Sequence, residues 1–220
     1  VWAAQISVTL AALAAGYVLG GRAADRWQDG WALHRGLFLA GILTALAVFV
    51  SPAVLKGCLI LGLAPGAFAS SGLLFGLPLV LLGSVGPQAV AWTGSSRPRG
   101  RSLGEVLALS TAGSLAATLL AAFVLIPHFG VRACFLGTAL ALSALGGVGT
   151  WGAGRGTGLS LLLGLILAVG AAQAGRTPSG FRLVARRSSF QGELWVVEQG
   201  PVRMLLMDGI IQTDAALNPG

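Results

Sequence analysis

Charged side chains are scarce in this chain. They make up 10% of the 220 residues, while hydrophobic residues make up 55%; an ordinary globular domain carries about 25% charged residues. Such a composition excludes a soluble globular domain over most of the length and indicates a protein of the lipid bilayer. The 34 glycines lie mostly inside apolar runs, where small residues let membrane helices approach one another closely.

Cysteine and metal ligands are nearly absent too. Cys58 and Cys134 are the only cysteines, and each lies in apolar sequence without a second ligand at metal spacing. His34 and His128 likewise have no cysteine, histidine or carboxylate at ligand spacing. We therefore predict buried thiols and interfacial histidines, with no metal site and no disulfide framework. No catalytic triad or carboxylate pair can be assembled either, so the sequence assigns no catalytic residue.

The net charge of +7 does not indicate a nucleic-acid partner, because the arginines are scattered between apolar runs instead of gathering on one soluble face. Two loops carry three arginines each: Arg22, Arg26 and Arg35, then Arg97, Arg99 and Arg101. The positive-inside rule puts both loops on the cytoplasmic side and leaves Lys56 and Arg132 on the other side.

Runs of about 20 apolar residues predict six membrane-spanning helices. They cover residues 2–21, 36–55, 66–92, 103–127, 131–149 and 159–174. The segment KGCLILGLAP, residues 56–65, is too short to cross alone; it extends a neighbouring helix or forms a re-entrant piece, which leaves the count open by one. Six spans would put the C-terminal segment outside, whereas its arginines favour the inside, so the parity also stays open.

Prolines, glycines and one polar motif predict how these helices bend, pack and begin. Prolines at 52, 65, 78, 87 and 127 predict bent or ended helices. Three glycine pairs have the spacing that serves close helix contact: Gly16 and Gly20, Gly62 and Gly66, and Gly72 and Gly76. Ser102 and Glu105 have the spacing of a capping box, which predicts a structural role for Glu105; the alternative is a carboxylate in a proton relay.

From Gly175 the composition changes to arginines and then to the alternation typical of strands. Strands are predicted over 190–198 and 202–207, and the turn signal Asp208-Gly209 leads into a third strand at 210–212. The predicted fold class is mostly α: a transmembrane helix bundle over residues 1–175, followed by a short antiparallel β-meander over 176–220. A meander of this size cannot bury enough surface alone, so we expect a larger soluble domain to follow.

Two further motifs are less specific. WGAGRGTG, residues 151–158, has no preceding strand and no following Gly-Lys-Ser, so it predicts a tight interhelical loop and not a phosphate site. GYVLGGRAADRW, residues 16–27, is loosely similar to the Gly-x-x-x-Asp-Arg loop of major facilitator transporters. That similarity keeps a transporter-like bundle with a regulatory soluble tail as the alternative function, and a membrane scaffold is a third.

The order of the pieces is more specific than any single motif. The helix ending in GYVLGGRAADRW is followed by LPLVLLGSVGPQAV, by STAGSLAATLLAAFVLIPHFGVR and by SSFQGELWVVEQGPVRMLLMDGIIQTD. This order resembles that of bacterial membrane proteins in which a transmembrane bundle is fused to a spermidine-synthase-like domain. The resemblance implies a multi-pass protein of the inner membrane, here a fragment with one more helix before Val1 and the catalytic part after Gly220.

The same resemblance implies site residues and a reaction. Phe190-Gln191 and the segment from Met207 to Gln212 stand where the family has a Tyr-Gln pair and Leu-Asp-Gly-x-x-Gln. Gln191 and Gln212 would then contact the nucleoside sulfonium donor or the amine acceptor; without the resemblance they are ordinary polar positions on exposed strand faces. The implied enzyme is an aminopropyltransferase with no cofactor, which transfers an aminopropyl group from its co-substrate, decarboxylated S-adenosylmethionine, to putrescine or a related amine. Its implied partners are the bilayer, these small molecules and possible further copies of itself, without nucleic acid.

Overall fold

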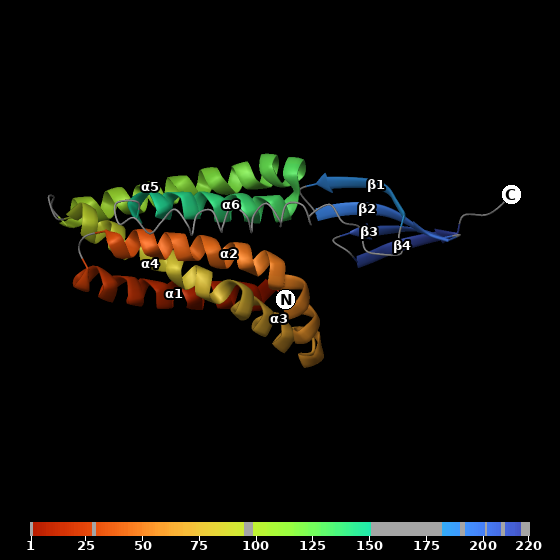
Figure 1. Cartoon of the computed structure of the whole chain (residues 1–220), viewed down its shortest axis with the longest axis horizontal. Coiled ribbons are helices and arrows are strands. Elements are labelled where there is room, and N and C mark those ends of the chain that lie inside the picture. Colours follow the sequence, from red (N-terminus) through yellow and green to blue (C-terminus); the bar gives the residue numbers. More distant parts are fainter. Residues whose placement is uncertain are drawn as a thin grey trace. The chain divides into compact units, whose positions relative to one another are not determined.

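The structure is a computed structural model that describes residues 2–27, 30–94, 99–150, 182–189, 192–200, 202–207 and 210–216. The chain divides into two compact units. One unit comprises Val1–Ala112 and Phe135–Gly170, and the other comprises Gly113–Cys134 and Ala171–Gly220. The described residues form six α-helices, which carry apolar runs, and four strands that follow them along the chain (Figure 1). The predicted boundary near residue 175 lies outside the described residues.

Five of the helices have 18 or more residues, α3 has nine, and short irregular turns join some of them. Their bounds are α1 (Trp2–Arg26), α2 (Trp31–Cys58), α3 (Leu63–Ser71), α4 (Leu77–Gly94), α5 (Arg99–Leu120) and α6 (Ile126–Thr150). A π-helical turn at Gly72–Gly76 joins α3 to α4, and another at Ala121–Leu125 joins α5 to α6. Pro78 and Pro127 each follow such a turn within two residues, so the helix continues through both prolines.

The structure does not support the predicted count of six spans. In the described part of the chain, four helical runs are long and apolar enough to cross a membrane: Trp2–Arg26, Trp31–Leu61, Leu63–Thr93 and Gly100–Gly147. The first three correspond to the first three predicted spans. The predicted fourth and fifth spans both fall within the run Gly100–Gly147, and the break between them lies at Gly130, three residues after Pro127. The sixth, residues 159–174, lies outside the described residues.

Two glycines mark the points where the helical path breaks. Gly130 has φ 79° and ψ 161°, and Gly62 has φ 87° and ψ 175°, a region open essentially to glycine alone. The run Gly100–Gly147 has 48 residues and would be about 72 Å long if straight, against roughly 30 Å for the hydrocarbon core. The break at Gly130 divides it into two lengths that each suit a bilayer.

The short segment 56–65 contains the end of one helix, a turn and the start of the next helix. Helix α2 continues to Cys58, a 3₁₀ turn covers Leu59–Leu61, and α3 begins at Leu63 after the break at Gly62. The Gly62 N–H donates to the Leu59 carbonyl over 3.1 Å, which closes the end of the 3₁₀ turn. Of the two predicted alternatives, extension of the neighbouring helices is therefore confirmed, and it applies to both neighbours.

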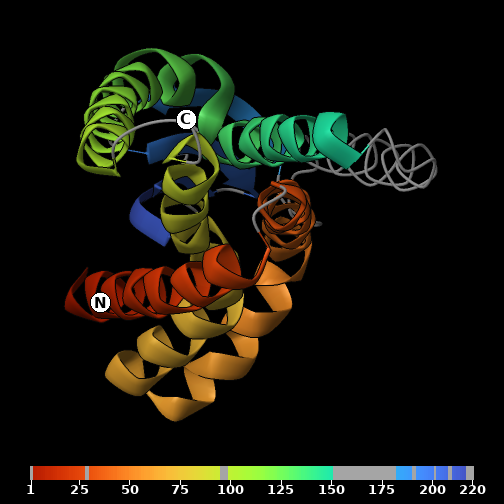
Figure 2. The ribbon, with the colours of Figure 1, turned by 90° about the vertical axis from the view of Figure 1, so that its left-hand side faces the viewer.

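Small residues make the contact between α1 and α4. The buried residues of α1 are Ala4, Ala12, Gly16, Gly20 and Ala24, which lie on one face at steps of four or eight residues. A Cβ atom at Gly16 would lie 2.9 Å from the Gly83 Cα, so the two backbones are in direct contact. Helices α1, α2, α3 and α4 pack together in this way as one bundle (Figure 2).

The other two glycine pairs behave differently from the prediction. Gly66 lies against the carbonyl of Cys58, so its contact closes the turn from α2 to α3 and does not join two separate spans. At Gly72 and Gly76 an added Cβ would meet nothing within 4 Å. The prediction of close contact at that pair is therefore wrong; both glycines lie in the π-helical turn and neither faces a neighbouring helix.

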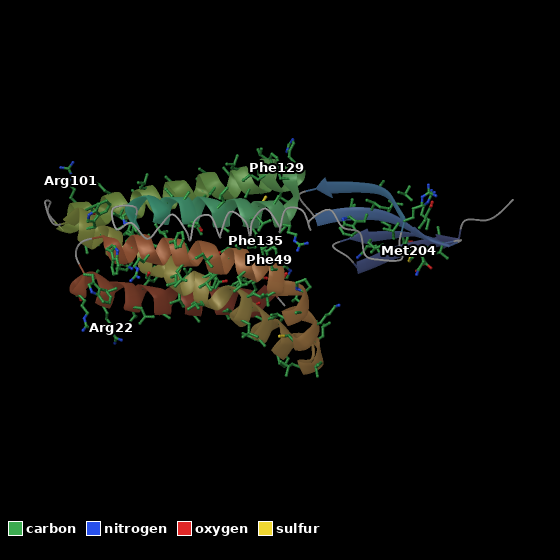
Figure 3. All side chains as sticks on the ribbon, in the orientation of Figure 1. Arg22, Phe49, Arg101, Phe129, Phe135 and Met204 are labelled. Carbon is green, nitrogen blue, oxygen red and sulfur yellow. The ribbon has the colours of Figure 1, made fainter. Side chains whose placement is uncertain are left out.

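A second close contact joins α2 to α6. A Cβ at Gly41 would lie 2.7 Å from the Ala139 carbonyl oxygen, and one at Gly146 would lie 2.7 Å from the Phe38 Cα. Between these points Ala45, Leu136 and Ala139 form a small buried cluster, with Phe49 packed beside it. Figure 3 labels Phe49 and Phe135 in this part of the bundle.

The C-terminal strands form an antiparallel meander, as predicted. They are β1 (Arg182–Ser189), β2 (Gly192–Gln199), β3 (Val202–Met207) and β4 (Ile210–Ala216), in that spatial order. The predicted strands do not include β1; β2 was predicted to begin at Phe190 and β4 to end at Gln212, whereas they begin at Gly192 and end at Ala216. Val197, Met204 and Leu206 form the buried centre of the sheet (Met204 is labelled in Figure 3), because Val197 pairs directly with Met204 on one face.

Candidate functional site

Gln212 occupies an irregular position in the sheet. Leu205 pairs with Thr213 and Leu206 pairs with Ile211, so Gln212 is the extra residue of a β-bulge on β4. The side chain of Gln212 is exposed. A bulge changes the direction of a side chain and interrupts the ladder locally, and bulges are frequent beside active sites. An exposed amide here can both donate to and accept from a ligand.

The rest of the motif predicted around Gln212 is only partly described. Met207 is the last residue of β3 and pairs with Ile210, the first residue of β4. Asp208 and Gly209 lie between these strands, outside the described residues. Gln191 and Phe190 stand between β1 and β2 and also lie outside the described residues, so the structure does not bring Gln191 and Gln212 together or separate them.

The buried centre of the sheet and its ion pair lie on opposite faces. One face carries the apolar residues Trp195, Val197, Met204 and Leu206. On the other face the Arg203 guanidinium donates to the Glu198 carboxylate, with Nε 2.9 Å from Oε1. Because Arg203 and Glu198 are directly opposite each other on β3 and β2, this ion pair supports the strand register.

A buried polar pair on α4 was missed by the sequence analysis. The Gln88 side-chain Nε2 donates to the carbonyl oxygen and to the hydroxyl oxygen of Ser84, both at 3.1 Å. Gln88 is 8% exposed, and its Oε1 has no hydrogen-bond partner among the described residues. The signal in the sequence was a serine and a glutamine four residues apart in an apolar run interrupted by Pro87.

The predicted capping box at Ser102 is replaced by a contact between helices. Helix α5 begins at Arg99, so Ser102 lies inside its first turn and does not precede it. The Ser102 Oγ lies 2.6 Å from the Thr93 Oγ1 at the end of α4, and Ser102 is 1% exposed. Glu105 accepts from the Arg101 Nε over 2.8 Å on the helix surface, which is consistent with its predicted structural role.

Histidine and cysteine do not form a metal site among the described residues. The His34 Nδ1 lies 2.8 Å from the Gly30 carbonyl oxygen, and the His34 ring packs edge-on against Trp92 with ring centroids 6.2 Å apart. The His128 Nδ1 lies 2.7 Å from the Val124 carbonyl oxygen. Cys58 is buried as predicted, whereas Cys134 is only half-buried.

One arginine from each of the first two charged loops, Arg22 and Arg101, lies at the same end of the bundle. Figure 3 shows Arg22, near the end of α1, and Arg101, near the start of α5, at the same end. The His34–Trp92 and Thr93–Ser102 contacts join the helix ends that carry them. These labelled arginines thus lie at the same end of this unit, and the cytoplasmic location of that end stays a prediction. The motif at 151–158 lies outside the described residues.

Comparison with known proteins adds no further constraint on these sites. No protein-family model, no curated protein and no solved structure matches the chain. The candidate sites are therefore two, the exposed bulge residue Gln212 on the sheet and the buried Ser84–Gln88 pair in the bundle, and their chemistry follows from their residues and surroundings.

Proposed function

We propose that this chain is the membrane part and the first strands of an aminopropyltransferase similar to spermidine synthase. The reaction transfers the aminopropyl group of decarboxylated S-adenosylmethionine to putrescine or a related amine. The amine nitrogen forms a bond to the propyl carbon next to the sulfonium, the carbon–sulfur bond breaks, and methylthioadenosine leaves. The attacking amine must be neutral, so a carboxylate outside residues 1–220 takes the proton.

The observation that supports this proposal is the position of Gln212. It is exposed and forms the bulge residue of β4, directly after the hairpin that carries the Asp-Gly turn signal. In the family that the sequence resembles, the corresponding glutamine faces the active-site cleft. The amide of Gln212 would bind sugar hydroxyls of the donor or the amine of the acceptor, and Gln191 would do so from the preceding hairpin.

The helices supply the anchor in this proposal. Four long apolar runs suit a multi-pass protein, and the family resemblance implies the inner membrane of a bacterium. The apolar face of the sheet, centred on Val197, Met204 and Leu206, is suited to packing against further strands of a soluble domain. An enzyme tethered in this way works on water-soluble polyamines at the membrane surface.

The test is an activity measurement on the full-length protein in membranes. The protein is incubated with decarboxylated S-adenosylmethionine and a series of diamines, and methylthioadenosine is measured. We expect turnover with at least one diamine, and we expect Gln212→Ala to lose it. The matched control is Thr213→Ala, which is the next residue on the exposed strand but pairs regularly with Leu205. Absence of methylthioadenosine with every diamine contradicts the proposal.

A transporter-like bundle is the second candidate, and the buried pair on α4 favours it. A polar side chain with an unsatisfied oxygen is costly inside a membrane protein, and such groups are found at substrate pathways. Gln88 is such a group, and Pro87 beside it removes one helical hydrogen bond from the carbonyl of Gly83.

Uptake of a radiolabelled diamine into proteoliposomes distinguishes the two candidates. A transporter takes up the diamine, and Gln88→Leu lowers the rate, while Ser110→Ala on the exposed face of α5 leaves the rate unchanged. An enzyme anchor shows no uptake above empty liposomes and still produces methylthioadenosine.

A further inference from the structure

Two arginine–tryptophan pairs flank the connection between α1 and α2. The Arg35 guanidinium carbon lies 3.9 Å from the ring centroid of Trp31, and the Arg26 guanidinium carbon lies 5.9 Å from that of Trp27. These distances are within the range of cation–π attraction. Trp27 and Trp31 are 51% and 41% exposed, so both rings face the surroundings of the protein.

The position of these pairs along the helices sets their depth in a bilayer. Arg26 is the last residue of α1 and Trp31 is the first residue of α2, and both helices belong to candidate membrane spans. Tryptophan side chains are enriched at the level of the lipid headgroups. A guanidinium held over such a ring therefore lies at the depth of the lipid phosphates.

Three arginines at this end are available to bind an anion. Arg22, one turn before Arg26, is exposed, as are Arg26 and Arg35. No carboxylate among the described residues pairs with any of the three. Arg101, at the same end, differs because it is paired with Glu105.

Stacking leaves the arginines able to donate hydrogen bonds. The ring of Trp31 covers one face of the Arg35 guanidinium, whereas the N–H groups lie along its edge. That edge matches two oxygens of a phosphate group. Lysine could not reproduce this arrangement, because its ammonium is a point charge without a flat face.

We propose that the α1–α2 arginine cluster, defined as Arg22, Arg26 and Arg35, binds the headgroup phosphates of anionic phospholipids, with Trp27 and Trp31 holding the guanidinium groups at headgroup depth. The cluster and the two rings lie on the consecutive helices α1 and α2 and on the residue that follows α1, so the site does not depend on the sheet or on the enzymatic proposal. Anionic lipid is the partner that fits, because the site combines three guanidinium groups that have no ion-pair partner among the described residues with exposed aromatic surface at the end of two spans.

The experiment measures lipid binding to the purified protein in mild detergent. Phosphatidylglycerol and phosphatidylcholine are titrated separately, and bound lipid is counted by native mass spectrometry. We expect tighter binding of phosphatidylglycerol, and we expect the double variant R26Q/R35Q to bind it about thirtyfold more weakly. The matched control is Lys56→Gln at the opposite end of α2, which should bind like the unaltered protein.

Two further measurements make the result decisive. Arg35→Lys keeps the charge but loses the stacked, flat group, so its affinity should fall between those of the unaltered protein and R26Q/R35Q. Soluble glycerol phosphate in excess should not displace the lipid, because it lacks the acyl chains that lie beside Trp27 and Trp31. Any one of four results would overturn the proposal. Two concern the main comparison: equal binding by R26Q/R35Q and the unaltered protein, or an equal loss of binding in Lys56→Gln. The other two are unchanged affinity in Arg35→Lys and displacement of the lipid by glycerol phosphate.

Discussion

Gly20 of α1 lies directly against the backbone of Ser84 of α4. A Cβ atom added to Gly20 would be 2.5 Å from the Ser84 Cα, closer than a Cβ atom approaches a carbon to which it is not covalently linked. One residue further along α1, a Cβ at Gly21 would meet nothing within 4 Å. Two adjacent glycines in one helix therefore have opposite roles, and only Gly20 is required for the close approach of the two helices.

This difference predicts opposite effects of the same substitution. Gly20→Ala should lower the free energy of unfolding by about 1–3 kcal/mol through overpacking. Gly21→Ala should be neutral or raise it by up to about 1 kcal/mol, because alanine favours the helix. Thermal unfolding of the two purified variants in detergent, followed by circular dichroism, measures both. Equal stability of the two variants would show that α1 and α4 do not meet at Gly20.

The hydroxyl pair Thr93–Ser102 predicts energetic coupling between α4 and α5. Because the oxygens are 2.6 Å apart and Ser102 is buried, a double-mutant cycle with Thr93→Ala and Ser102→Ala should give a coupling energy of about 0.6 kcal/mol. Thr111, whose hydroxyl bonds only to the Leu107 carbonyl of its own helix, provides the control. A cycle between Thr93→Ala and Thr111→Ala should show no coupling.

The break at Gly130 predicts a glycine-specific position. Any other residue is strained at φ 79° and ψ 161°, so Gly130→Ala should destabilise the protein by about 1–3 kcal/mol. Gly137→Ala, in the same helical run and with open space around it, should not. Thermal unfolding separates the two cases, and an unaltered midpoint for Gly130→Ala would mean that the helix runs straight through this residue.

Two valines in the sheet allow a matched test of its core. Val197 is 1% exposed, whereas Val184, the extra residue of a bulge on β1, is 46% exposed. Val197→Ala should cost about 2 kcal/mol, and Val184→Ala should cost little. In the full chain the loss is measured as faster hydrogen exchange of the β2 and β3 amides. Similar exchange in both variants would contradict the assignment of the sheet core.

The grouping of arginines at one end of the bundle predicts the orientation in the membrane. Gly57 follows Lys56 near the end of α2, and Gly100 precedes Arg101 on α5; both are exposed. In a protein with Cys58 and Cys134 changed to alanine, Gly57→Cys should react with an impermeant maleimide added to intact cells. Gly100→Cys should react only after lysis. The opposite pattern would invert the orientation.

Several elements could be predicted because their signals are local. The first three apolar runs and the meander follow from hydropathy and from strand alternation, which depend on neighbouring residues alone. The predicted close helix contact at Gly16 and Gly20 is also confirmed. The pair Gly72 and Gly76 has the same spacing and makes no such contact, because spacing along one helix contains no information about the helix opposite.

Other elements depend on contacts between residues that are distant in the sequence. Ser102 has the spacing of a cap, yet its hydroxyl contacts Thr93 of another helix. Pro127 suggests the end of a helix, yet the break lies at Gly130, because a π-helical turn before the proline accommodates it. Strand β1 carries arginines that conceal its alternation, and it is recognised only through its pairing with β2.

The amino-acid sequence by itself indicated that this is a membrane protein and which kinds of secondary structure it forms. A scarcity of charge and long apolar runs favour a bilayer, because exposure of these runs to water would be unfavourable. Only the tertiary structure decided which glycines touch another helix, where the helical path breaks, and that Gln212 is a bulge residue while Gln88 is a buried amide. These properties depend on which residues pack against each position in space, and a local sequence pattern does not identify those packing partners.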